Sequence, residues 1–333
     1  MEERDVIIIG GGPAGISAGI FAALDGWSTL LLEGRWKGGQ AAIASTVVNY
    51  PGFLPGDGAN LIENMIQQLS SPPPKGVGAE IREERVIDID PDKKEIITTK
   101  NQYQAKAIVL ATGSEMKKLG AKGEDKFIGR GVSYYARRDL EKFANKNVLV
   151  VGGGNSTAKS ALLAKTVAKK LIMIHRRESL RTYPMMTRRL EKEGLEIWFN
   201  TELKEIKGKD KVERVIVVNN KTGEEKELEM DWVVICAGTA PNTELARKIG
   251  LKLKGDYIEV DEKLMTSKQG IFACGEVAGC IKHLINCAGQ GAEAGMAVSE
   301  YLARELVKAG KMFKGAKNGK YADEYLKELN QSS

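Results

Sequence analysis

The stretch from Val6 to Gly15 reads VIIIGGGPAG, an apolar run that enters a G-x-G-x-x-G turn. A strand that feeds such a turn and then a helix offers backbone N–H groups and the positive end of the helix dipole to a dinucleotide pyrophosphate. The next apolar run, Thr29–Leu32, ends in Glu33, and an acid there accepts hydrogen bonds from ribose hydroxyls. The first turn therefore predicts a site for FAD or NAD, formed by Gly10, Gly12, Pro13, Ala14, Gly15 and Glu33.

A second glycine turn of the same design lies near the middle of the chain. The apolar run Val148–Val151 enters GGGNST at residues 152–157, and the next run, Leu171–Ile174, ends in basic residues instead of an acid. Arginines clamp a phosphate through bidentate hydrogen bonds, although arginines on a solvated helix start are the alternative interpretation. The second turn predicts an NADPH site formed by Gly152, Gly154, Asn155, Ser156, Thr157, His175, Arg176, Arg177 and Arg181, with His175 supporting the loop.

The chain uses one order of elements twice. Each turn is followed by an expected helix, at residues 16–24 and 158–167, and then by short strand-like stretches typical of a meander. These stretches lie at residues 86–89, 95–99 and 107–110 in the first block, and at 195–198, 212–218, 226–229 and 232–235 in the second. The two blocks end in similar short motifs after their last strand. We therefore expect Ala111, Thr112 and Gly113 at the first cofactor, and Ala237 and Gly238 at the second.

This repeat predicts an α/β fold with two Rossmann-like three-layer dinucleotide-binding domains. The segment that begins at Pro241 has no glycine turn of its own and runs into an alanine- and glycine-rich helix that ends near Leu306. We expect this segment to return and complete the first domain. The first domain then contains residues 1–115 and 241–310, the inserted NADPH domain contains residues 116–240, and residues 311–333 form a C-terminal extension.

Composition and charge narrow the class of protein. A length of 333 residues suits two domains. No apolar run approaches about 18 residues and no signal peptide is evident, so we expect a cytoplasmic protein without membrane association. Four cysteines without C-x-x-C spacing and two histidines predict no metal site. The net charge of +6 is scattered among acids, which argues against nucleic acid and suits an acidic protein partner.

The motifs, in their order along the chain, resemble those of the low-molecular-weight thioredoxin reductase family of flavoproteins. The resemblance extends over nearly the whole chain. The resemblance rests on both glycine turns, on Gly38-Gly39-Gln40, on the Asn-Tyr-Pro-Gly-Phe segment at 49–53, and on Phe-Ala-Cys-Gly-Glu-Val at 272–277. It implies FAD in the discontinuous domain, NADPH in the inserted domain and a homodimer. By this resemblance Gly38, Gly39, Gln40 and Asn49 line the flavin, Val86 flanks the adenine, and Gly275, Glu276, Lys282, His283 and Leu284 meet the ribityl chain and the isoalloxazine edge.

The resemblance fails at the motif through which the family transfers electrons from its flavin to a protein disulfide. The family has Cys-x-x-Cys-Asp, but this chain has Tyr135 and Arg138 at the cysteine positions, followed by Asp139. Thiol–disulfide exchange needs two sulfurs in reach, so these side chains cannot relay electrons to a protein disulfide. The sequence therefore assigns no catalytic side chain. A relocated redox pair of Cys280 with Cys287 stays open beside a simple packing role for both.

Without that dithiol, electrons must pass from the flavin directly to an acceptor. Ferredoxin is a one-electron carrier whose usual acidity matches a basic protein. A related branch, the thioredoxin-reductase-like ferredoxin–NADP reductases, lacks the disulfide and covers the flavin with an aromatic ring from a C-terminal extension. The extension here carries Phe313, Tyr321 and Tyr325, in that role or in a surface helix. The sequence predicts a ferredoxin–NADP reductase. The alternatives are an NAD(P)H oxidase or diaphorase, a disulfide reductase that uses other cysteines, and a non-catalytic nucleotide-sensing flavoprotein.

Overall fold

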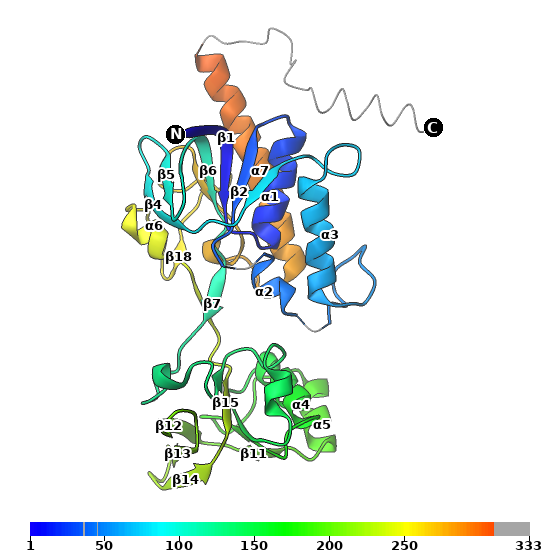
Figure 1. Ribbon diagram of the computed structural model, residues 1–333, viewed down its shortest axis with the longest axis vertical. Helices are drawn as coiled ribbons and strands as arrows, with labels where there is room; N and C mark the ends of the chain where they lie inside the picture. Colours follow the sequence, from blue (N-terminus) through cyan, green and yellow to red (C-terminus); the bar gives the residue numbers. More distant parts are fainter. Residues whose placement is uncertain (36, 45, 310–333) are drawn as a thin grey trace. The chain divides into compact units, whose positions relative to one another are not determined.

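The computed structural model describes residues 1–35, 37–44 and 46–309, and the chain divides into two compact units (Figure 1). The first unit contains Met1–Glu115 and the described chain that begins at Ala240, and the second contains Met116–Thr239. The chain crosses from one unit to the other at β7 (Ser114–Met116) and β16 (Thr239–Pro241), which pair with each other. The predicted C-terminal extension, 311–333, lies outside the described residues.

The first unit is built on a sheet whose central strands are parallel. β1 lies between β2 and β6, and β19, from the last part of the described chain, pairs with β6. The central strands are continuous apolar runs, as strands covered on both faces require. β4, β5 and β6 form the predicted antiparallel meander. The strands are β1 (Glu2–Ile9), β2 (Thr29–Leu32), β3 (Glu80–Arg82), β4 (Val86–Asp90), β5 (Glu95–Thr98), β6 (Gln102–Leu110) and β19 (Ile271–Ala273).

Helices cover one face of this sheet, and α1 and α7 lie side by side there (Figure 1). Glycines let them approach closely, because a Cβ at Gly291 would lie 2.1 Å from Ala14 O and a Cβ at Gly295 would lie 2.6 Å from Ala18 O. The β4–β5 hairpin at the end of the sheet, α6 and the β17–β18 pair pack on the other face of the central strands, which gives three layers. The elements are α1 (Pro13–Leu24), α2 (Gly39–Ala42), α3 (Gly58–Ser70), α6 (Glu244–Lys248), β17 (Leu253–Lys254), β18 (Tyr257–Ile258), η3 (Gly275–Ala278) and α7 (Leu284–Lys308).

The second unit repeats this plan around a parallel sheet in the order β11-β10-β9-β15-β8. One face of the sheet packs on a separate antiparallel sheet of β12, β13 and β14, and the other packs on α4. The elements are η1 (Asp125–Phe127), β8 (Val132–Ser133), η2 (Leu140–Phe143), β9 (Asn147–Val151), α4 (Asn155–Lys165), β10 (Lys170–Ile174), α5 (Pro184–Lys192), β11 (Glu196–Trp198), β12 (Thr201–Lys207), β13 (Arg214–Asn219), β14 (Glu225–Glu229) and β15 (Trp232–Ile235).

The predicted fold class is confirmed, but the second meander was assigned wrongly. The stretch 195–198 contains β11, which pairs parallel with β10 in the main sheet of this unit. The meander begins instead with β12, which the sequence did not single out. Leu203 and Ile206 of β12 are buried, but a bulge between Leu203 and Glu205 shifts the alternation of buried and exposed side chains. The sequence of β12 therefore lacks the regular alternation expected of a strand and is typical of a charged loop.

Candidate functional site

The first glycine turn lies where the carboxyl ends of the parallel strands of the first unit meet. Ile9 pairs with Leu32 on one side and with Leu110 on the other. This is the edge at which open α/β sheets bind their ligands. The residues that follow the three strands share this edge, and they are Gly10, Glu33 and Ala111.

The glycines of this turn serve different purposes. Gly10 has φ +114°, and a Cβ there would lie 2.3 Å from Ala111 O. A Cβ at Gly15 would lie 1.9 Å from Gly10 O, so packing requires both glycines. A Cβ at Gly12 would meet nothing within 4 Å, because this position faces open space before Pro13, the first residue of α1. The turn therefore fits a pyrophosphate held against the helix N-terminus.

Backbone N–H groups hold the Glu33 carboxylate at the turn. Its Oε2 accepts a hydrogen bond from Gly11 N and its Oε1 accepts one from Arg35 N, each at 2.7 Å. Each carboxylate oxygen keeps a further lone pair. The side chain can therefore also accept hydrogen bonds from ribose hydroxyls, and its negative charge disfavours a ribose phosphate.

A chain of hydrogen bonds links predicted flavin residues that lie far apart in the sequence. Gly38 N donates to Gly11 O at 2.9 Å, which brings the start of α2 to the turn. Gln40 Nε2 donates to Ser114 O at 2.6 Å and to Ser114 Oγ at 3.0 Å, and Ser114 Oγ donates to the Glu276 carboxylate in η3. Ser114 was missed as a site residue, although it directly follows the Ala-Thr-Gly motif, which is the signal that could have found it.

The other predicted flavin residues lie on further strands, helices and loops of the first unit. Gly275 N donates to Gln290 Oε1 at 2.7 Å, which connects η3 to α7, and Thr112 Oγ1 donates to Asn242 O at 2.8 Å. Val86 begins β4. Val86 follows Arg85. Gly34, the residue after Glu33, packs on Arg85, since a Cβ at Gly34 would lie 2.9 Å from Arg85 Cα. Asn49 is exposed on the loop between α2 and α3, Lys282 and His283 are exposed on the loop before α7, and Leu284 begins α7.

The second glycine turn has the same relation to its strands. Val151 pairs with Ile174 and with Ile235, so the residues after these strands meet at one edge. A Cβ at Gly152 would lie 2.5 Å from Thr157 Oγ1, whereas a Cβ at Gly154 would meet nothing within 4 Å. The residues that meet at this edge are Gly152, His175 and Cys236, with Ala237 and Gly238 exposed just beyond.

His175 lies beneath the second turn and is 4% exposed. A Cβ at Gly153 would lie 2.2 Å from its Cε1, so the imidazole packs directly on the turn. Burial, and then the positive charges of the neighbouring arginines, lower the pKa of His175 and keep it neutral at pH 7. Its Nε2 has no hydrogen-bond partner within the described part of the chain. This geometry is that of a supporting residue.

The loop from His175 to Tyr183 closes against the same turn. Arg181 N donates to Gly153 O at 2.7 Å, and Tyr183 N donates to Asn155 Oδ1 at 2.9 Å. The side chains of Arg176, Arg177 and Arg181 are exposed. The positive charges of all three arginines act on His175, which lies beneath the turn, and guanidinium groups of this kind can hold a phosphate. Tyr183 was missed because nothing in its sequence neighbourhood marks it.

The positions expected to replace the family's redox cysteines form a compact polar cluster. The Arg138 guanidinium lies 5.0 Å from the centre of the Tyr135 ring. Asp139, whose side chain is 3% exposed, accepts hydrogen bonds from Ser133 Oγ at 2.6 Å, Lys142 Nζ at 2.8 Å and Arg138 Nη2 at 3.1 Å. Burial alone would raise the pKa of Asp139, but these donors outweigh it and lower the pKa. Asp139 is therefore a fixed carboxylate.

Two features of the described residues bear on other kinds of site. Within residues 1–35, 37–44 and 46–309, no group of histidine, cysteine and acidic side chains has the arrangement of a metal site. In the same ranges, no helix combines the length and apolar character needed to cross a bilayer.

Comparisons with known proteins identify the family of this chain. The family model described as pyridine nucleotide-disulphide oxidoreductase matches residues 4–291. The thioredoxin reductase of Treponema pallidum is 37% identical over 305 residues, which cover 90% of this chain and 97% of that protein. The thioredoxin reductase of Bacillus subtilis is 34% identical over 306 residues, covering 90% and 96%.

Solved structures give the same result. Thioredoxin reductase from Lactococcus lactis superposes with a TM-score of 0.84 at 33% identity, and that from T. acidophilum with 0.82 at 32% identity, each over 90% of this chain and 99% of the other. Proteins of the thioredoxin reductase family bind FAD and depend on NADPH, so both predicted cofactors are confirmed. Fold, site and relatives together place this FAD-dependent NADPH oxidoreductase in the pyridine nucleotide-disulphide oxidoreductase family.

Proposed function

We propose that this chain is a ferredoxin–NADP reductase, in which electrons leave the flavin for a one-electron carrier. The observation that carries the proposal is the pair Tyr135 and Arg138, which stack on each other where the family resemblance places a redox dithiol. Neither side chain contains sulfur, and exchange with a protein disulfide requires two sulfurs in reach. The residues assigned to the NADPH and FAD sites are otherwise present in the chain, so we assign the difference from thioredoxin reductases to the electron acceptor.

In this proposal the first unit holds FAD. When bound, FAD takes a hydride from NADPH and can release its electrons one at a time. The Gly10–Gly15 turn holds the pyrophosphate and Glu33 accepts hydrogen bonds from the ribose. Gln40, Ser114 and Glu276 form one hydrogen-bonded chain that fixes the flavin-binding loops relative to the turn. The residues assigned to surround the cofactor further out are Gly38, Gly39, Asn49, Val86, Ala111, Thr112, Gly113, Gly275, Lys282, His283 and Leu284.

The second unit holds NADPH. The Gly152–Thr157 turn binds its pyrophosphate, and Arg176, Arg177 and Arg181 clamp the 2′-phosphate. Neutral His175 supports the turn from below and transfers no proton. Ala237 and Gly238 border the same edge of the sheet.

Ferredoxin as the acceptor is supported by charge. The chain has a net charge of +6, and ferredoxins are usually acidic, so opposite charges would steer the encounter. Ferredoxin reduction by NADPH should then be fast at low salt and should slow steeply as salt is added. Reduction of an uncharged quinone by the same protein is the control and should change little. A ferredoxin rate no higher than background at low salt would overturn the proposal.

The other candidate functions predict different results in the same assay. An oxidase or diaphorase would consume NADPH with oxygen or quinone as fast as with ferredoxin. A nucleotide-sensing flavoprotein would show no reduction of its flavin by NADPH. Homodimer formation and cytoplasmic location stay predictions.

A further inference from the structure

The loop that follows β10 carries the arginines assigned to the 2′-phosphate, and its main chain is held at three successive carbonyl groups. His175 O accepts a hydrogen bond from Thr201 N at 2.9 Å, and Arg177 O accepts one from Asn200 N at 3.2 Å. Both donors lie where β12 begins. The carbonyl between them, Arg176 O, accepts its hydrogen bond from a side chain of another hairpin.

That side chain is Asn220, in the turn between β13 and β14. Its Nδ2 donates to Arg176 O and to Glu202 Oε1, each at 2.8 Å, and its main-chain N donates to Asn200 O at 2.8 Å. An amide nitrogen has two N–H groups, so both side-chain bonds can form together. Asn220 is thereby held by β12 and by the residue before it, and it holds the main chain from which the Arg176 side chain extends. The two residues are 44 positions apart in the sequence, so no local motif reveals the contact.

The next residue of the turn, Lys221, acts through charge. Its Nζ pairs with a carboxylate oxygen of Glu178 at 3.0 Å. Glu178 directly follows Arg177, so its negative charge lies in the segment that has to attract a phosphate. A like charge there weakens phosphate binding, and the Lys221 ammonium offsets it. Asn219 Oδ1 accepts a hydrogen bond from Lys221 N at 2.9 Å, which fixes the main chain of Lys221 in the turn.

We propose that Asn220 and Lys221 are positioning residues that raise the preference of the second unit for a phosphorylated ribose. Asn220 fixes the main chain of Arg176, so the guanidinium loses less conformational freedom when it binds the 2′-phosphate. Lys221 reduces the repulsion between Glu178 and that phosphate. Neither residue needs to touch the nucleotide. The inference rests on the proposed phosphate clamp and adds the turn that holds the clamp in place.

The test measures the dissociation constants of NADP⁺ and NAD⁺ by titration calorimetry on the flavin-loaded protein, so no electron acceptor takes part. Asn220→Ala should weaken NADP⁺ binding about three- to tenfold, because one hydrogen bond that holds the clamp is lost. NAD⁺ has no phosphate on that ribose, and its dissociation constant should change less than about twofold. A turn that only supports the fold would weaken both nucleotides alike, and that result would overturn the proposal.

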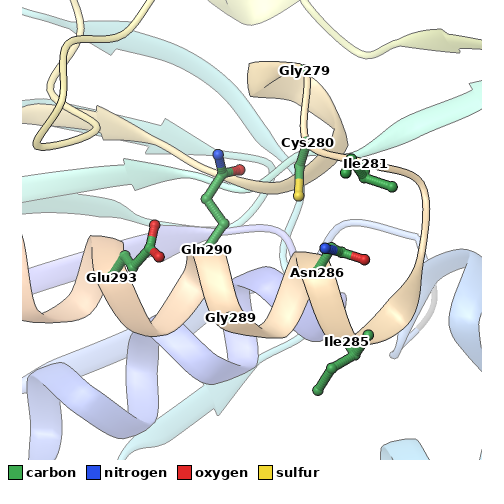
Figure 2. Close-up of a pocket in the computed structure, with 8 residues that line it drawn as sticks. All are labelled: Gly279, Cys280, Ile281, Ile285, Asn286, Gly289, Gln290 and Glu293. Atoms are coloured by element: carbon green, nitrogen blue, oxygen red, sulfur yellow. The ribbon is translucent and has the colours of Figure 1, made fainter. Parts of the chain in front are cut away.

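The matched control is Asn286→Ala, in the first unit. Asn286 is an exposed asparagine on α7, where it lines an open pocket of about 450 Å³ together with Cys280 and Gln290 (Figure 2). Because the second unit does not contain this residue, its loss should leave both dissociation constants unchanged. An effect on NADP⁺ as large as that of Asn220→Ala would show that the loss is not specific to the β13–β14 turn, and it would overturn the proposal.

A double variant tests whether Asn220 acts through Arg176. In an Arg176→Ala background, Asn220→Ala should change the NADP⁺ dissociation constant less than about twofold, since the side chain that Asn220 positions is then absent. An effect of Asn220→Ala that is as large in this background as in the parent protein would refute the assignment.

The role of Lys221 is tested in the same way. Lys221→Ala should weaken NADP⁺ binding about twofold to fourfold at low salt and less at high salt, because both groups of the ion pair are exposed. The effect should disappear once Glu178→Gln has removed the carboxylate. Lys209→Ala, an exposed lysine at the other end of β13, controls for the loss of a positive charge and should leave NADP⁺ binding unchanged. A Lys221→Ala effect that persists beside Glu178→Gln would refute the charge argument.

The double variant Arg176→Ala/Arg177→Ala separates this inference from the proposed clamp. We expect both this variant and Asn220→Ala to lose preference for NADP⁺ over NAD⁺. An unchanged preference in the arginine variant would refute the clamp, and the inference with it. A preference that the arginine variant loses but Asn220→Ala keeps would refute the inference alone and leave the clamp standing.

Discussion

The guanidinium of Arg138 lies 5.0 Å from the centre of the Tyr135 ring, so the two positions that the family resemblance assigns to redox cysteines are occupied by a cation stacked on an aromatic face. Such a pair contributes about 0.5–1 kcal/mol at a partly exposed site. Arg138 also donates to Asp139. The segment is therefore stabilised by stacking and ion pairing, and it offers no sulfur for exchange.

Asp139 should make folding depend on pH. Its pKa is lowered in the folded state, so it stabilises the protein above the unfolded-state value of about 3.9 and loses this effect as the pH falls through the folded-state value. Asp139→Asn should lower the free energy of unfolding at pH 7 by roughly 1.5–3 kcal/mol, because charge-assisted hydrogen bonds are lost. Urea denaturation at pH 7 and at pH 3 would measure this, and the difference from the parent protein should shrink at pH 3.

The control for that measurement is Asp125→Asn. Asp125 pairs with Lys118 at 2.7 Å, but its side chain is 73% exposed, so its loss should cost less than about 1 kcal/mol at either pH. An Asp139→Asn effect as small as this, or one equal at both pH values, would show that the buried carboxylate is not a stabilising ion.

The open glycines of the two turns should separate FAD binding from NADPH binding. Gly12 and Gly154 both have extended backbone and space for a Cβ, so Gly12→Ala and Gly154→Ala should both fold normally. The methyl at Gly12 would stand where a pyrophosphate is held, which should weaken FAD binding about tenfold to a hundredfold. Gly154→Ala should keep its FAD and weaken NADPH instead. Flavin content and NADPH titration provide the readouts, and a Gly12→Ala protein with full FAD would refute the assignment.

The arginines at the second turn should select NADPH over NADH. Replacing Arg176 and Arg177 together by alanine should raise the KM for NADPH about 10- to 100-fold, because two charge-assisted hydrogen bonds are removed. The KM for NADH should change less than about twofold, since NADH has no phosphate there. Arg188→Ala, on the exposed part of α5, is the matched control and should leave both values unchanged. Equal effects on the two nucleotides would contradict the phosphate clamp.

Much of the fold and both turns could be predicted because their signals are local. An apolar run, a glycine turn and the charge after the next strand are read within about 30 residues, and parallel register then places Glu33 and His175 beside their turns. The residues that sequence reasoning missed act over long separations. Ser114 connects Gln40 to Glu276, and Tyr183 holds Asn155, through contacts that no local pattern encodes.

Steady-state oxidation of NADPH with ferredoxin, thioredoxin and oxygen offered side by side tests the central claim most directly. Direct electron transfer from the flavin to ferredoxin predicts that ferredoxin is reduced much faster than thioredoxin or oxygen at low salt. The difference in rate should become smaller at high salt. Turnover of thioredoxin at a rate equal to or above that of ferredoxin would contradict it, because a dithiol relay would then operate despite Tyr135 and Arg138.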